Sequence, residues 1–283
     1  MEVGISSCSK VVDRDLMSQM DKYNVRYLEI SQGDDYHQDR DLKGVRRLAD
    51  EYGITLWSFH LPFAPFSRLN PASFDKELRD RTVRRFSELI RRAADIGIKR
   101  MVVHPSGERV YEPDRPQAIE YAKDTFARLM PVTKELGVTL CVEDLPRLCL
   151  GNCSDDILAL ISADDSIRVC FDTNHLLKQS DVDFVNAVGS KIETVHVSDF
   201  DYVNERHWLP GEGDLPWQDI IKALKESGYK GPWLYEIGFA AEKTIIRDRM
   251  LTVKDFADNA KALFEGRIPE PIGHRKPNLG MWE

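Results

Sequence analysis

Four side chains that can bind a metal ion stand at the ends of short apolar runs in the second half of the chain. They are Glu143, Asp172, His196 and Glu236. Successive members lie between 24 and 40 residues apart, which leaves room for one helix between each run and the next. Three carboxylates and one imidazole form an oxygen-rich shell that suits a divalent cation. The sequence therefore predicts a site for one divalent metal ion, and Mn²⁺, Co²⁺, Zn²⁺ and Mg²⁺ all accept such a shell.

The chemistry of such a site follows from its charge. A divalent ion that holds neighbouring carbonyl and hydroxyl oxygens polarises the carbonyl and acidifies the adjacent C–H bond. Two glutamates beside the ion can then remove a proton and return it to the other face or to the next carbon. We expect Glu143 and Glu236 to serve as both ligands and acid–base pair, with Asp172 and His196 as ligands only. The outcome is epimerisation or isomerisation of a ketose, keto-sugar or keto-cyclitol. If a leaving group sits on the next carbon, the same first step gives a dehydratase or lyase.

The elements that must position these residues alternate regularly along the chain. Short β-branched and apolar runs without in–out alternation are typical of a parallel sheet that is buried on both faces. Eight such runs occur, at 3–6, 26–31, 55–60, 100–104, 139–143, 168–172, 194–197 and 233–236, and amphipathic stretches between them include 39–52, 74–96, 115–136 and 217–227. The pattern predicts an α/β protein with a single (β/α)8 TIM barrel over 1–265. A doubly wound open sheet is the alternative, but no G-x-G-x-x-G follows the first run.

Histidines also gather where the predicted strands end. Six of the seven histidines lie at these ends or in the loops that follow, namely His37, His60, His104, His175, His196 and His207. In a parallel barrel the strand ends meet at one mouth, where active sites form. Burying such groups without partners costs several kcal/mol. The set therefore favours a metal and substrate site over ordinary packing.

Composition and charge exclude several other classes. The chain has 39 basic and 47 acidic residues, a formal net charge of −8, which disfavours a nucleic-acid partner. The basic runs 40–47 and 79–92 follow helical periods and are expected to form solvated outer faces. No apolar run reaches the roughly 18 residues of a membrane span. An N-terminus without a signal pattern and five cysteines, an odd number, predict a cytoplasmic protein with free thiols.

Two further segments have open interpretations. The C-terminal extension, 266–283, is rich in proline and glycine and contains Trp282. We expect it to drape over the barrel or to contact a second subunit of a homo-oligomer. In the loop after the seventh run, Gly211 and Gly213 flank Glu212, and this loop either approaches a ligand closely or forms a tight turn.

At these residues the chain resembles the xylose-isomerase-like TIM barrel superfamily, from its first strand to Glu236. The segments WSFHLPF, VVHPSGE and ERHWLPGEGDLPW are similar to those of the group described as sugar phosphate isomerases and epimerases. The resemblance implies that Glu143, Asp172, His196 and Glu236 hold the metal and that the partner is a small sugar. It also implies that His175 and Arg206 contact the substrate. We expect His60, His104 and His207 at the substrate site as well, although for His60 and His104 support of the metal ligands and binding of further metal ions stay open as alternative roles.

The same superfamily includes endonuclease IV, which binds three zinc ions through nine residues. His60, His104 and Glu143 resemble its first site, the four predicted ligands its second, and His175, Glu205 and His207 its third, with Glu205 in place of an aspartate. A phosphodiesterase acting at abasic sites is thus an alternative. The acidic net charge and the aspartates of the 31–39 loop oppose binding of a DNA backbone. Aromatic residues near the strand ends, among them Trp57, Phe63 and Trp208, suit a sugar ring.

Overall fold

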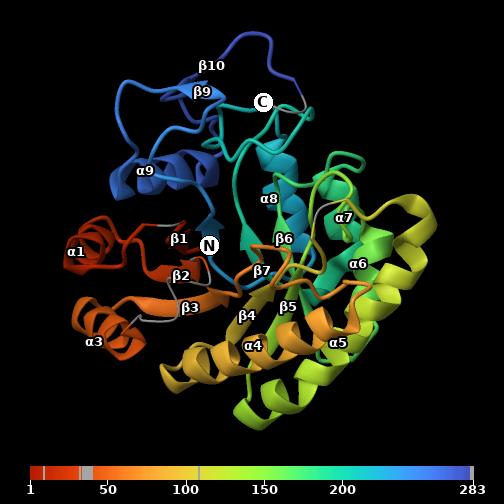
Figure 1. Ribbon diagram of the computed structural model, residues 1–283. Coiled ribbons are helices and arrows are strands. Elements are labelled where there is room, and N and C mark those ends of the chain that lie inside the picture. The colour runs from red at the N-terminus through yellow and green to blue at the C-terminus, as the bar shows by residue number, and fades with distance from the viewer. Residues whose placement is uncertain (9, 32, 34–40, 108, 281–283) are drawn as a thin grey trace.

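Eight parallel strands form a barrel in the computed structural model (Figure 1), which describes residues 1–280 except 9, 32, 34–40 and 108. The strands are β1 (Val3–Ser6), β2 (Tyr27–Ser31), β3 (Thr55–His60), β4 (Arg100–Val103), β5 (Thr139–Glu143), β6 (Arg168–Asp172), β7 (Ile192–His196) and β8 (Trp233–Tyr235). They are hydrogen-bonded in the order β7-β6-β5-β4-β3-β2-β1-β8. A parallel bridge between Val197 and Tyr235 joins the two ends, and the amide of Val197 donates to the carbonyl of Leu234 at 2.9 Å. The predicted (β/α)8 barrel is confirmed.

The helices lie outside the ring of strands (Figure 1). They are α1 (Arg14–Lys22), α3 (Leu42–Tyr52), α4 (Lys76–Asp95), α5 (Arg115–Leu136), α6 (Ser154–Ile161), α7 (Asp181–Val188), α8 (Trp217–Glu226) and α9 (Val253–Phe264). The four ranges predicted from periodicity match α3, α4, α5 and α8 to within three residues at each end. Helices α3 and α5 are followed directly by Gly53 and Gly137, which cap their C-terminal ends. The φ angles of these two residues, 64° and 60°, favour glycine over residues with a Cβ.

Two register shifts aim polar side chains into the barrel. Between β6 and β7, a shift after Val169 places His196 opposite Asp172. Between β2 and β3, a shift after Leu28 places Ser58 opposite Glu29. Such irregularities redirect side chains and are common beside active sites. All four of these polar residues are buried, so the shifts determine which groups meet inside the ring.

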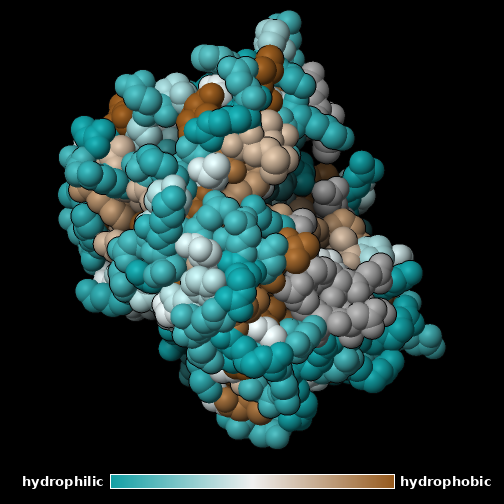
Figure 2. All heavy atoms as spheres, turned by 90° about the vertical axis from the view of Figure 1, so that its left-hand side faces the viewer, coloured by the Kyte–Doolittle hydropathy of each residue, from teal (hydrophilic) through white to brown (hydrophobic). Residues whose placement is uncertain are grey.

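The outer helical faces are charged and solvated, as predicted for the two basic runs. On α3, Arg46 pairs with Asp50, and Arg47 lies 3.2 Å from Asp41. Figure 2 shows mostly hydrophilic side chains on the face that includes α1 and α3, with small apolar patches between them. Arg79 is an exception in the second run, because its guanidinium lies 4.0 Å from the ring centre of Tyr121 and is buried. Among the described residues, no helix is both long and apolar enough to cross a membrane.

The C-terminal extension folds back onto the loops at the strand ends (Figure 1). Its strand β10 (His274–Arg275) pairs antiparallel with β9 (Ile245–Ile246), which lies in the segment after β8. Arg275 also forms two 2.8 Å hydrogen bonds with Asp214. The expected draping over the barrel is therefore seen for the described part of the extension. Trp282 lies outside the described residues.

The loop that contains Glu212 is a tight turn that packs closely against neighbouring segments of the chain. A Cβ on Gly211 would lie 2.5 Å from the carbonyl oxygen of Pro269, and one on Gly213 would lie 2.0 Å from Asp199. These glycines let the loop pack against the C-terminal extension and against Asp199, which follows β7. Of the two functions considered for this loop, close approach to a ligand and a tight turn, the structure therefore shows the tight turn. Glu212 is buried and accepts hydrogen bonds from Arg247 and from two backbone amides, those of Leu209 at 2.9 Å and Gly273 at 2.7 Å.

Substituting Glu212 tests how much this connection stabilises the fold. We expect Glu212→Gln to lower the free energy of unfolding by about 3 kcal/mol, because it leaves the fully buried Arg247 guanidinium without a counter-charge. Urea unfolding of the metal-free protein measures the change. The matched control is Glu265→Gln, which removes an exposed partner of Arg267 and is expected to leave the stability almost unchanged. Equal effects of the two substitutions would contradict the prediction.

Candidate metal centre and active site

The four predicted ligands meet at the C-terminal mouth of the barrel. Glu143, Asp172 and His196 end strands β5, β6 and β7, and Glu236 directly follows β8. The Nδ1 atom of His196 lies 2.9 Å from Glu143 Oε1, 3.2 Å from Glu236 Oε2 and 3.9 Å from Asp172 Oδ2. One ligand atom from each of the four residues lies within 4.8 Å of the others. This arrangement can surround a single cation.

The electrostatics of this group fit a divalent cation. Asp172 Oδ2 is buried and has no hydrogen-bond partner. Burial raises the pKa of Asp172 to about 7, and the neighbouring carboxylates of Glu236 and Glu143 add to the rise. The buried Glu143 and Asp172 and the partly buried Glu236 therefore gather three acidic groups around one imidazole. A divalent ion would supply positive charge and would bind the unpartnered oxygen of Asp172.

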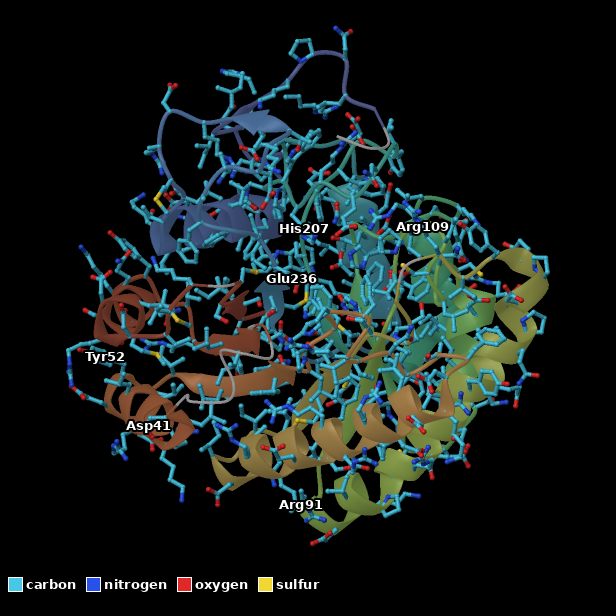
Figure 3. All side chains as sticks on the ribbon, in the orientation of Figure 1. Asp41, Tyr52, Arg91, Arg109, His207 and Glu236 are labelled. Atoms are coloured by element: carbon cyan, nitrogen blue, oxygen red, sulfur yellow. The ribbon has the colours of Figure 1, made fainter. Side chains whose placement is uncertain are left out.

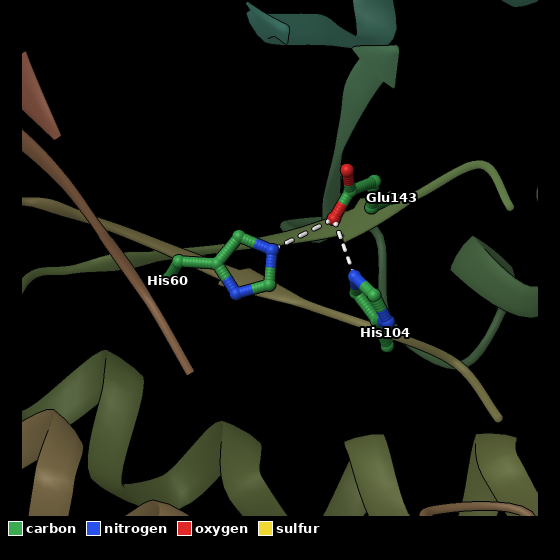
Figure 4. A group of neighbouring side chains, drawn as sticks. All are labelled: His60, His104 and Glu143. Atoms are coloured by element: carbon green, nitrogen blue, oxygen red, sulfur yellow. Dashed lines mark hydrogen bonds and ion pairs between the residues drawn. The ribbon is translucent and has the colours of Figure 1, made fainter. Parts of the chain in front are cut away.

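A second group shares Glu143 and extends toward β3 and β4. The Nε2 atoms of His60 and His104 lie 3.0 and 3.1 Å from Glu143 Oε2 (Figure 4). His60 Nδ1 lies 2.8 Å from the carbonyl oxygen of Leu61, which can only accept, so Nδ1 bears a hydrogen. The Nε2 atom that faces Glu143 must then be protonated or must direct its lone pair at a cation. Burial opposes the charged form, but the hydrogen bond that His60 donates to Glu143 and the charge of that carboxylate outweigh it and raise the pKa of His60 to about 9.

A third group, His175, Glu205 and His207, repeats this arrangement. Glu205 Oε1 lies 3.0 Å from His207 Nε2 and 3.8 Å from His175 Nε2. The Nδ1 atom of His175 lies 2.7 Å from the carbonyl oxygen of Asp144, and that of His207 lies 3.2 Å from the carbonyl oxygen of Glu236. Figure 3 shows His207 and Glu236 as neighbours at the mouth. Burial lowers the pKa of His207, but Glu205 outweighs this and raises it to about 9.

A cavity of about 380 Å³ opens onto all three groups. This volume lies within the range of small-molecule sites. The cavity is lined by Cys8, Ser31, His60, Phe63, His104, Glu143, His175, Glu205, His207, Glu236, Gly238 and Glu242. Four of the five residues predicted to contact substrate therefore face one space. His37, the remaining histidine of the predicted strand-end set, lies outside the described residues.

Arg206 is the exception among the predicted substrate-binding residues. Its side chain is buried, its Nε donates to Asp201 at 3.0 Å, and its Nη2 donates to the carbonyl oxygen of Gly280 at 2.8 Å. It is not among the residues that line the cavity. The structure therefore does not bring Arg206 to the cavity with the other four, because its guanidinium points toward the C-terminal extension; a contact with the substrate stays a prediction.

Three further carboxylates adjoin these groups. Glu205 entered the sequence analysis only as a ligand of the third endonuclease-like site, and the buried Glu29 and Asp144 were not predicted as site residues. Glu29 lies 3.0 Å from His196, and Asp144 accepts a hydrogen bond from the backbone amide of Asp172 at 2.8 Å. Glu205 lies between the imidazoles of His175 and His207. The Glu205-x-His207 spacing was a usable signal. Asp144 directly follows a predicted ligand but is hard to distinguish from a surface carboxylate. Glu29 comes three residues into its strand, and its contact with His196 depends on the closure of the barrel.

The protein is thus a (β/α)8 barrel, and the His, Glu and Asp clusters at its strand ends are consistent with a metal centre. The chain belongs to the family described as "Xylose isomerase-like TIM barrel", whose model matches residues 19–255. The resemblance inferred from the strand-end residues is confirmed.

Relatives in this family differ in function. The chain is 27% identical over 248 residues to the uncharacterized protein MJ1311 of Methanocaldococcus jannaschii, covering 82% of each chain. It is 24% identical over 216 residues to D-psicose 3-epimerase of Ruminiclostridium cellulolyticum, covering 71% of this chain and 69% of the relative. It is also 25% identical over 235 residues to the probable endonuclease 4 of Acholeplasma laidlawii, covering 76% and 79%.

Solved structures with the same fold include several sugar epimerases. A D-tagatose 3-epimerase-like protein superposes with a TM-score of 0.78 at 24% identity, covering 94% of this chain and 97% of that one. The IOLI protein with a bound zinc atom superposes with a TM-score of 0.74 at 16% identity, covering 94% and 97%. At these identities the superpositions establish the fold alone.

Proposed function

We propose that this protein is a divalent-metal-dependent isomerase or epimerase that acts on a ketose, keto-sugar or keto-cyclitol. The observation that carries the proposal is the placement of Glu143 and Glu236. Both reach the same imidazole nitrogen, Nδ1 of His196, Glu143 from the end of β5 and Glu236 from the residue after β8, and both line the cavity. A divalent ion held by these two residues with Asp172 and His196 would polarise a substrate carbonyl.

The two glutamates are suited to move protons. Burial raises the pKa of Glu236, but the charge of His196 outweighs this and lowers it to about 2. Burial likewise opposes ionisation of Glu143, yet His196 and His104 hold the pKa of Glu143 well below its ordinary value. Both side chains are therefore carboxylates at neutral pH. One can accept a proton from the carbon next to the carbonyl, and the other can deliver a proton to the opposite face once it has itself taken one up from solvent.

The rest of the lining favours an unphosphorylated sugar. Glu205 and Glu242 add negative charge, and the described lining residues include neither lysine nor arginine. The imidazoles of His60, His175 and His207 also line the cavity and offer polar surface to hydroxyl groups. Phe63, which stacks on His104 with ring centres 4.4 Å apart, offers an apolar surface for one face of a sugar ring.

A specific observation also supports a second candidate, a phosphodiesterase that uses three metal ions. The three ligand groups lie around one cavity, the first two share Glu143, and one relative is a probable endonuclease 4. Three ions would reverse the charge of the acidic cavity and could hold a phosphate. Elimination by a dehydratase or lyase is a further outcome of the first candidate, because the proton abstraction is shared.

The metal content per chain distinguishes the candidates without knowledge of the substrate. The protein is loaded with excess Zn²⁺ or Mn²⁺, desalted and measured by elemental analysis. We expect one tightly bound ion, followed by deuterium incorporation into a member of a keto-sugar panel in D₂O. Two or three ions together with cleavage of abasic-site DNA would favour the phosphodiesterase. Formation of an eliminated product without return of the proton would identify a lyase.

A further inference from the structure

We propose that Glu29 is a positioning residue that fixes the tautomer and orientation of His196, so that His196 presents Nδ1 to the metal. The proposal rests on the metal site of the proposed function and adds a residue beyond its ligands. Glu29 does not line the cavity, so its role is to act through His196 and not on a substrate.

The two ring nitrogens of His196 face different surroundings. Nδ1 faces the three carboxylates of the predicted site. Nε2 lies 3.0 Å from Glu29 Oε2, on the opposite side of the ring. Neither His196 nor Glu29 has any exposed side-chain surface, so solvent does not compete for this contact.

This division determines where the proton of a neutral imidazole lies. A carboxylate can only accept a hydrogen bond, so Nε2 of His196 carries the hydrogen. Nδ1 faces Glu143 Oε1 at 2.9 Å and would give up its hydrogen when an ion binds, so that its lone pair would then point toward the predicted metal position. Histidine ligands commonly donate their second nitrogen to a carboxylate, which fixes the ring and makes the ligand nitrogen more basic.

Glu29 is itself held in place by the neighbouring strand. Ser58 donates its hydroxyl to Glu29 Oε2 at 2.7 Å, and the register shift between β2 and β3 makes the two residues partners. On another side, the His196 ring lies nearly parallel to that of His60, with an interplanar angle of 17° and ring centres 5.8 Å apart. The chain Ser58–Glu29–His196 thus runs from β3 through β2 to β7 across the barrel.

The test measures metal binding and the histidine tautomer. Zn²⁺ affinity is measured by competition with a chelating dye for the wild type, Glu29→Gln and Ser58→Ala. We expect Glu29→Gln to weaken binding 10- to 100-fold, in the range found for partners of metal-binding histidines, and Ser58→Ala to weaken it by a few fold. Glu193→Gln is the matched control, because Glu193 lies on the same strand as His196 but pairs with Arg100. It is expected to leave the affinity unchanged.

Nuclear magnetic resonance of ¹⁵N-histidine protein loaded with ¹¹³Cd²⁺ gives a readout that general destabilisation does not produce. In the wild type we expect coupling between cadmium and Nδ1 of His196 and a slowly exchanging proton on Nε2. In Glu29→Gln that proton signal should shift upfield or disappear, because an amide is a weaker acceptor and can also donate. The wild-type spectrum decides the tautomer even if Glu29→Gln does not fold.

Cadmium coupling to Nε2 in the wild type, or a folded Glu29→Gln protein with unchanged Zn²⁺ affinity and spectrum, would overturn this proposal alone. A wild-type protein that binds neither Zn²⁺ nor Cd²⁺ would instead overturn the proposed metal-dependent function, and the role of Glu29 with it.

Discussion

Glu143→Gln is expected to remove tight metal binding and turnover together. Glu143 Oε1 faces Nδ1 of His196, while Oε2 faces His60 at 3.0 Å and His104 at 3.1 Å. The substitution keeps the size of the side chain but removes one negative charge, and it places an NH₂ group against neighbours that need an acceptor. Loss of the proton-transfer group alone is expected to lower turnover by about 10²- to 10⁴-fold. Weakened metal binding should add to this loss.

Elemental analysis after desalting and deuterium exchange on keto-sugars measure the two effects on the same samples. Glu242→Gln is the matched control, because Glu242 lines the same cavity but belongs to none of the metal-capable groups found among the described residues. It should retain the bound ion. Full activity in Glu143→Gln would refute the role assigned to Glu143. Normal metal content with lost activity would restrict that role to proton transfer.

Removal of the metal is expected to make the stability of the protein fall as the pH rises from 7 to 9. Without an ion, the pKa values of His60 and His207 lie at about 9, above the ordinary value of 6.5. A group whose pKa is raised by folding contributes stability fully below its unfolded pKa and loses it as the pH rises through its folded pKa. At about 1.4 kcal/mol per pKa unit, the two imidazoles together account for a loss of a few kcal/mol over this window. Asp172 acts in the same direction at lower pH, since folding raises its pKa to about 7.

The metal-loaded protein should not show this decline. A divalent ion beside Glu143 repels a proton on His60, so metal binding releases protons and becomes stronger as the pH rises. The stabilisation by metal, measured as the difference in urea unfolding between loaded and metal-free protein, should therefore be larger at pH 9 than at pH 7. A metal-free protein that is equally stable at both values would show that these imidazoles do not carry the charge inferred from their contacts.

The strand-end residues could be predicted from the sequence because each one closes a short run of apolar and β-branched residues. The parallel strands of a barrel all point the same way, so identifying the end of a run also identifies its face. That reasoning alone brought Glu143, Asp172, His196 and Glu236 to one place. The same local logic located the helices, whose periodicity and terminal glycines depend only on nearby residues.

The loop after β7 shows where this logic stops. Glu205, Arg206 and His207 are consecutive, yet the first and third face the cavity and the second is buried against Asp201 and Gly280. A strand alternates its side chains by a fixed rule, but a loop has no such period. The direction of Arg206 depends on the C-terminal extension that packs beside it.

The barrel, the face that carries the site and the set of side chains able to hold a metal could all be predicted from the sequence, because these features follow from short-range periodicity. Three contacts could not be predicted and depend on the folded chain: Glu29 lies against His196, Arg206 bonds to the C-terminal extension, and Gly211 packs against that extension. Glu29 and His196 are 167 residues apart. Such contacts depend on strand register and on barrel closure, which are settled by packing summed over the whole chain.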